Sequence, residues 1–126
     1  DAPPEPEVQT SEAVELAAPT PNETITSPLT ISGGARGFWF FEADFPVILT
    51  DWDGRIIAEH YATADGEWMT ESFVPFSSTL EFESPYQPGD PEFMQRGTLI
   101  LQRSNPSGLP ENDAAVEIPI RFSASE

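Results

Sequence analysis

The sequence predicts an all-β protein, an antiparallel β-sandwich built from about seven short strands. Apolar and polar residues alternate over several short runs, most regularly in residues 116–122, as expected of strands with one buried face. In addition, 14 Pro and 8 Gly interrupt the chain so often that long helices are excluded. With 126 residues the chain is long enough for one domain with an ordinary hydrophobic core.

The centre of the predicted fold is residues 34–54, GARGFWFFEADFPVILTDWDG. Residues 38–41 are four consecutive aromatics, so in a strand two of them would point to each face. A second apolar run leads into the Asp-Trp-Asp-Gly step at 51–54, and residues 55–61 lead away from it. This order predicts a strand, a tight turn that ends in Gly54, and a returning strand.

The remaining strands are expected at residues 14–16, 29–33, 74–82, 97–102 and 116–122. The run at 97–102 is apolar on both faces, which is typical of a central strand. Taken together, the inward positions of these strands predict a core that contains Phe40, Leu49, Ile57, Phe76, Leu99, Ile118 and Ile120.

The first residues differ in composition from the rest, so we divide the chain into an acidic, Pro-rich N-terminal arm at 1–12 and the sandwich domain at 13–126. Such an arm buries too little apolar surface to fold alone and is expected to be an extended tether. The alternative is that it docks on an exposed sheet edge of a neighbouring copy, with Val8, Val14 and Leu16 as apolar anchors. Head-to-tail contacts of that kind generate filaments.

The charge is strongly negative: 22 acidic residues against five basic ones, all Arg, give −17 at pH 7. A surface of this kind repels nucleic acid and anionic lipid, so neither is expected as a partner. The absence of Cys excludes disulfides and thiol chemistry, and no apolar run is long enough to insert into a membrane. The start at Asp1 suggests a mature chain after signal-peptide removal, so we expect a secreted, extracellular or cell-surface protein.

Several short motifs occur in the order found in one known family. They are ITSPLTISGGA at 25–35, FEA at 41–43, TDWDGRIIA at 50–58, the strand at 76–82 and VEIPI at 116–120. With these motifs the chain resembles the immunoglobulin-like domain of bacterial spore-germination proteins over nearly all of residues 14–122. The resemblance implies an immunoglobulin-like sandwich that serves as an extracytoplasmic, non-catalytic module.

The sequence offers little for catalysis or metal binding. His60 is the only histidine, and no nucleophile-elbow pattern supports a Ser-His-Asp triad through it, so we do not expect an enzyme. Asp51, Asp53 and Asp65 lie in predicted turns, where oxygen ligands can hold calcium, the one cofactor that the sequence suggests. The alternative, which we favour, is that these residues only form the turns.

Three tryptophans are the candidate binding residues: Trp39, Trp52 and Trp68 could contact a carbohydrate or a protein partner. The alternative, which we favour, is that they fill the core and cover the ends of the sandwich. Two functions remain open. The first is a surface module that acts through protein–protein contact, including contact with copies of itself. The second is a carbohydrate-binding module that uses exposed Trp side chains.

Overall fold

The computed structural model describes residues 14–104 and 115–123, and it confirms the all-β class. The strands are β1 (Val14–Ala18), β2 (Thr24–Ile25), β3 (Leu29–Arg36), β4 (Asp44–Thr50), β5 (Ile56–Ala64), β6 (Phe73–Leu80), β7 (Arg96–Gln102) and β8 (Ala115–Phe122). Two short 3-10 helices, η1 (Gly37–Trp39) and η2 (Glu92–Gln95), are the helices of the described part. Neither has the length and apolar character needed to cross a membrane.

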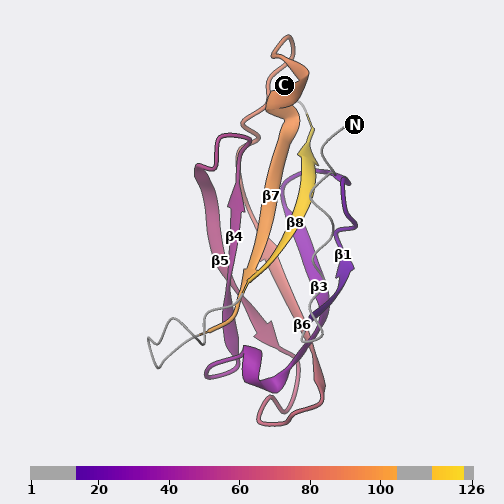
Figure 1. Ribbon diagram of the computed structural model, residues 1–126, viewed down its shortest axis with the longest axis vertical. Coiled ribbons are helices and arrows are strands. Elements are labelled where there is room, and N and C mark those ends of the chain that lie inside the picture. The colour runs from indigo at the N-terminus through magenta and orange to yellow at the C-terminus, as the bar shows by residue number, and fades with distance from the viewer. Residues whose placement is uncertain (1–13, 105–114, 124–126) are drawn as a thin grey trace, which may run out of the picture.

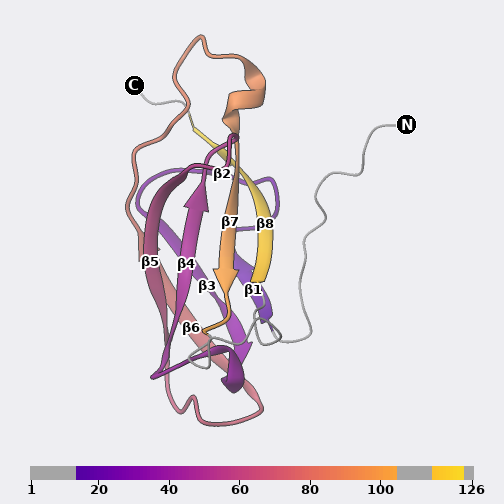
Figure 2. The same cartoon turned by 60° about the vertical axis from the view of Figure 1, so that its left-hand side comes forward.

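The eight strands form one curled sheet in the order β1-β3-β6-β5-β4-β7-β8-β2. The layer of β1, β3 and β6 packs behind the layer of β4, β7 and β8, as Figures 1 and 2 show from two directions. Between the layers, β5 pairs with β4 along its length but with β6 only at Thr63 and Ala64, and there the sheet bends. The sandwich is therefore one folded-over sheet, because β5 joins both layers.

Two details of the pairing differ from the expected seven-stranded antiparallel arrangement. The additional strand is β2, a two-residue segment that lies between the expected strands at 14–16 and 29–33. It pairs with β8 in the parallel direction, through Thr24 with Arg121 and Ile25 with Phe122. The other strand pairs are antiparallel.

The alternating pattern fills the core as expected. In β6 every second side chain, from Val74 to Leu80, is buried. Phe45 lies fully buried at the centre, with its ring edge-to-face against Phe40 at 5.3 Å and Phe76 at 4.9 Å. Six of the seven predicted core residues are buried, and the seventh, Ile57, is half-buried against the core next to the β4–β5 turn.

The prediction that residues 38–41 form a strand is wrong. The chain passes from β3 in one layer to β4 in the other at this point, and η1 makes the crossing. Trp39 and Phe40 are buried, whereas Phe38 and Phe41 are 48% and 47% exposed. Gly37 is required here, because a Cβ at this position would collide with the backbone oxygens of residues 68 and 70.

The two ends of the sandwich carry different features. One end holds the β4–β5 turn at 51–54 and helix η2, and we name it the cleft end. Gly54 in that turn has a φ of +81°, which glycine adopts without strain. The opposite end holds η1, the β5–β6 loop at 65–72 and the start of β1, and we name it the arm end (Figure 1). The predicted arm at 1–12 and its boundary with the domain lie outside the described residues.

Candidate functional site

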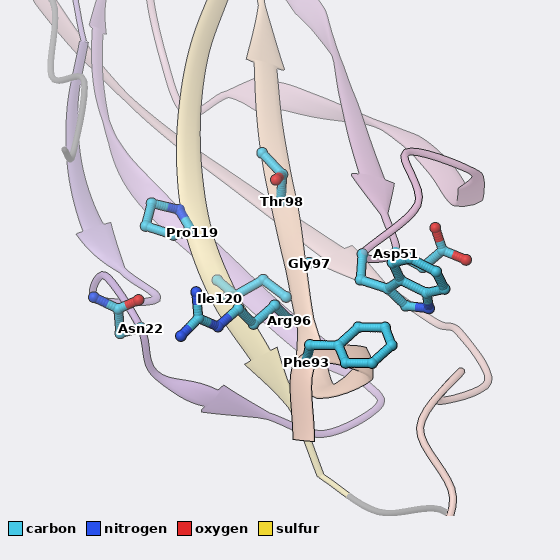
Figure 3. A pocket seen from close by; sticks show the side chains of 9 residues that line it. Asn22, Asp51, Phe93, Arg96, Gly97, Thr98, Pro119 and Ile120 are labelled. Carbon is cyan, nitrogen blue, oxygen red and sulfur yellow. The ribbon is translucent and has the colours of Figure 1, made fainter. Parts of the chain in front are cut away.

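A cleft of about 260 Å³ opens at the cleft end, on the outer side of β7 and β8. Figure 3 shows Asn22 on one side of it, Asp51 and Phe93 on the other, and Arg96, Gly97 and Ile120 between them. The lining residues are Asn22, Asp51, Trp52, Phe93, Arg96, Gly97, Thr98, Pro119 and Ile120. They come from four separate segments, so the fold alone brings them together.

Two exposed aromatic rings form one wall of the cleft. Trp52 belongs to the β4–β5 turn and is 44% exposed, and Phe93 belongs to η2 and is 53% exposed. Their ring centroids lie 5.0 Å apart at an interplanar angle of 84°. This edge-to-face contact fixes the two loops against each other and leaves much of both rings open to a ligand.

The local structure of the turn explains how Trp52 is presented. The Asp51 side chain turns back on the backbone, where its Oδ1 accepts hydrogen bonds from the N–H groups of Asp53 and Arg55, each at 2.9 Å. The backbone also closes the turn, since the Gly54 N–H donates to the Asp51 carbonyl at 3.1 Å. Hydrogen bonds within the turn therefore fix its conformation, and the Trp52 indole is left exposed.

One arginine, Arg96, lines the cleft, and a second, Arg121, is its neighbour on the adjacent strand. Arg96 of β7 lies directly opposite Arg121 of β8 in the strand register, so both side chains belong to the outer face. Within the described residues, the single ion pair joins Arg55 to Asp53 at 3.9 Å, and neither Arg96 nor Arg121 has a carboxylate partner. In a chain of net charge −17, this pair of adjacent cations provides a local site for carboxylate groups.

The three aspartates proposed for calcium do not form one site. Asp51 and Asp53 lie in the turn at the cleft end, whereas Asp65 follows β5 at the arm end. The nine residues of β5 that separate them span about 27 Å. Across 14–104 and 115–123, no group of three metal-binding side chains is present. The structure therefore separates Asp65 from the other two aspartates, and the Asp51 side chain holds the turn together.

The three tryptophans do not form a common surface either. Trp39 is 2% exposed, which corrects the expectation that it contacts a glycan or a partner, because its ring fills the core. Trp68 lies half-buried against the core in the β5–β6 loop, at the arm end. Trp52 is the one of the three that presents an open ring beside a cleft.

Phe93 is not among the binding residues predicted from the sequence. The available signal was an aromatic residue within the polar, Pro- and Gly-rich stretch at 84–95, where burial in a regular strand is not expected. Its contact with Trp52 depends on the tertiary structure. That contact could not be anticipated from either segment on its own.

The apolar anchors proposed for self-association have different positions. Val8 lies outside the described residues. Val14 is fully buried in the core, and Leu16 packs half-buried against it while paired with Gly33 of β3. Both therefore hold β1 to its own domain, and this corrects the expectation that they anchor the arm on a neighbour.

Comparison with known proteins gives one family. The family model described as the immunoglobulin-like domain of bacterial spore germination matches residues 13–94, which is more than half of the chain. The match includes β1 to β6, the turn that carries Trp52, and Phe93. No curated protein and no solved structure matches the chain significantly.

Proposed function

Since this chain belongs to the immunoglobulin-like domain family of bacterial spore germination, we propose that it is a non-catalytic, extracytoplasmic module that binds a protein partner. The binding surface is the cleft of Trp52, Phe93 and Arg96. The observation that carries this proposal is the exposed edge-to-face pair of Trp52 and Phe93 beside an open cleft.

The composition of the cleft favours a protein as the ligand. Trp, Phe and Arg are enriched at protein–protein interfaces, and Trp and Arg supply many of their strongest contacts. The cleft combines all three types with the apolar surface of Pro119 and Ile120. Large exposed rings also cost little conformational entropy when they are ordered by a partner, since each has two side-chain torsions.

The non-catalytic part of the proposal rests on the family and on the position of His60. This side chain lies exposed in the middle of β5, opposite Val47 of β4. It is therefore a surface residue of a strand, and the cleft is built from other segments.

A second candidate function, carbohydrate binding, is favoured by one observation. The open ring of Trp52 is accompanied by the polar side chains of Asp51, Asn22 and Thr98 in the same cleft. An aromatic face with nearby hydrogen-bonding groups is the combination that suits a sugar ring. The near-perpendicular orientation of Phe93 limits the flat stacking area to a single ring, which is why we place this candidate second.

The proposal is tested by site-specific photo-crosslinking on the bacterial surface. A photoreactive phenylalanine analogue replaces Phe93 in one variant and Tyr61, an exposed residue of β5, in the control. We expect a discrete protein adduct from position 93 and none from position 61, and Trp52→Ala should abolish the adduct. Equal labelling from both positions, or no adduct at position 93, would show that the cleft is not the binding surface.

The carbohydrate candidate is tested separately with a panel of soluble glycans. If a sugar ring stacks on Trp52, the bound glycan protects this indole from acrylamide quenching, and Trp52→Ala removes the binding with little loss of stability. Protection by no member of a broad panel would eliminate this second function and leave the first untouched.

A further inference from the structure

Residues 2–8, Ala-Pro-Pro-Glu-Pro-Glu-Val, have the composition of a ligand for an aromatic cleft. This segment lies outside the described residues, and its amino-acid sequence defines its chemistry. Three prolines within four residues favour the polyproline II helix, which is already extended and loses little entropy on binding. Segments of this kind are bound by aromatic-lined grooves in several recognition domains.

We propose that the cleft of Trp52 and Phe93 binds residues 2–8 of a second copy, so that copies of the chain join head to tail. This inference rests on the proposed function and names the partner. The two rings, at 84° to each other, form a notch that can receive a proline ring, and Pro119 extends the apolar floor. The partner is thus recognised first by its prolines.

The charges of the segment and of the cleft are complementary. Glu5 and Glu7 are two residues apart, which places them about 6 Å apart along a polyproline II helix. Arg96 and Arg121 are directly opposite each other on adjacent strands, with Cβ atoms about 5 Å apart. A polyproline II helix has three residues per turn, so the two Glu side chains leave it about 120° apart, and the long Glu and Arg side chains must converge to pair. In that arrangement Arg96 and Arg121, which lack a carboxylate partner among the described residues, would each gain one.

The place where the chain enters the domain favours binding to another copy. Val14 pairs with Ala35 next to η1, so β1 begins at the arm end, whereas the cleft adjoins Thr50 and Asp51. Strand β4 runs between the two ends, and its seven residues span about 20 Å. A chain that passes over the surface of the sandwich from one end to the other must cover more than this distance. Pro6, the proline nearest to the domain, is at most about 28 Å of fully extended chain from Val14. Since β1 runs from the arm end toward the cleft end, the segment would also have to reverse its direction to reach its own cleft.

Exposed apolar side chains at both ends support a head-to-tail contact. Of the large hydrophobic residues that are exposed, Phe38, Phe41, Met69 and Phe73 lie at the arm end. Trp52, Ile56 and Phe93 lie at the cleft end. Stacking the arm end of one copy on the cleft end of the next would cover both groups. The two surfaces differ, so the contact does not close on itself and continues into a filament.

The test is a complementation experiment with the full chain. Trp52→Ala gives a variant with a defective cleft and an intact segment, and Glu5→Lys with Glu7→Lys gives the reverse. Sedimentation velocity should show that the intact chain grows with concentration, and that each variant alone associates at least about tenfold more weakly. An equimolar mixture should form a dimer and stop there, because one working contact remains. Tyr61→Ala, outside both ends, should assemble as the intact chain does.

The outcomes separate this inference from the proposed function. An intact chain that stays monomeric, or variants that assemble as it does, would overturn head-to-tail binding. A mixture that forms no dimer would do so as well. If position 93 still crosslinks to a different protein in that case, the cleft is a binding surface and only the identity of the partner is wrong. If position 93 gives no adduct at all, both proposals fail.

Discussion

The indole of Trp52 and the phenyl ring of Phe93 meet edge to face, with centroids 5.0 Å apart, although one belongs to a hairpin turn and the other to a distant helical turn. This contact joins the β4–β5 turn to η2 and forms the wall of the cleft. Both rings remain about half exposed. The pair can therefore organise the surface while contributing little to the core.

The first prediction compares Trp52→Ala with Phe45→Ala. Phe45 is fully buried between Phe40 and Phe76, so its removal should lower the free energy of unfolding by about 3–5 kcal/mol. Trp52→Ala should cost about 1 kcal/mol, because it loses mainly the contact with Phe93. Urea denaturation measures both. A double-mutant cycle with Phe93→Ala should give a coupling of about 0.5–1.5 kcal/mol.

The second prediction concerns tryptophan fluorescence. Trp39 is 2% exposed, and its Nε1 has no hydrogen-bond partner within the described residues, so its emission should lie at short wavelength and resist acrylamide. Trp52 should supply most of the quenchable emission. Trp52→Phe is therefore expected to shift the emission maximum to shorter wavelength and reduce quenching. Equal quenching of the variant and the parent protein would show that Trp39 or Trp68 is the accessible ring.

The strands could be predicted because alternation is a local signal that survives in the fold. The pattern at 116–122 became β8, with Val116, Ile118 and Ile120 buried. The Asp51–Gly54 turn was also predictable, since a side-chain acceptor and a glycine at fixed positions define its geometry. Burial and turn chemistry act within a few residues, which is why sequence reasoning works for them.

The strand prediction for the aromatic residues 38–41 was wrong for a physical reason. Four consecutive large apolar residues are compatible with a strand and with a short helical turn. The chain must cross from one layer to the other here, and this crossing favours η1. That crossing buried Trp39 and Phe40 and left Phe38 and Phe41 exposed, so the four rings do not alternate as they would in a strand. The cleft could not be predicted from the sequence, because it too depends on the tertiary structure. Its wall depends on the placement of η2 beside the β4–β5 turn, a contact between segments far apart in sequence.

The third prediction tests the packing beneath the cleft. A Cβ on Gly97 would collide with the ring of Phe122 and lie 2.5 Å from the carbonyl oxygen of Thr50. Gly97→Ala should therefore lower the free energy of unfolding by about 1–3 kcal/mol. Gly34 in β3 is the matched control, because a Cβ there meets nothing closer than 3.8 Å.

Gly34→Ala should be neutral or stabilise the protein by up to about 0.5 kcal/mol, since glycine in a strand carries an entropic cost. Both variants are measured by urea denaturation under the same conditions. If the two alanines have the same effect, the close approach of Phe122 to Gly97 does not constrain the site.

The last prediction distinguishes the turn role of Asp51 from a metal role. Its Oδ1 accepts two backbone N–H groups, at 2.9 Å each, so Asp51→Ala should lower the free energy of unfolding by about 1–2 kcal/mol. Asp51→Asn keeps a carbonyl acceptor in the same place and should lose less than half of that amount. Asp53→Ala removes only an exposed ion pair with Arg55 and should change stability by less than about 0.5 kcal/mol. Thermal unfolding in calcium and in chelator provides the decisive comparison. If calcium stabilises the parent protein and this gain disappears equally in Asp51→Asn and Asp53→Ala, the two carboxylates are metal ligands and the turn explanation is wrong.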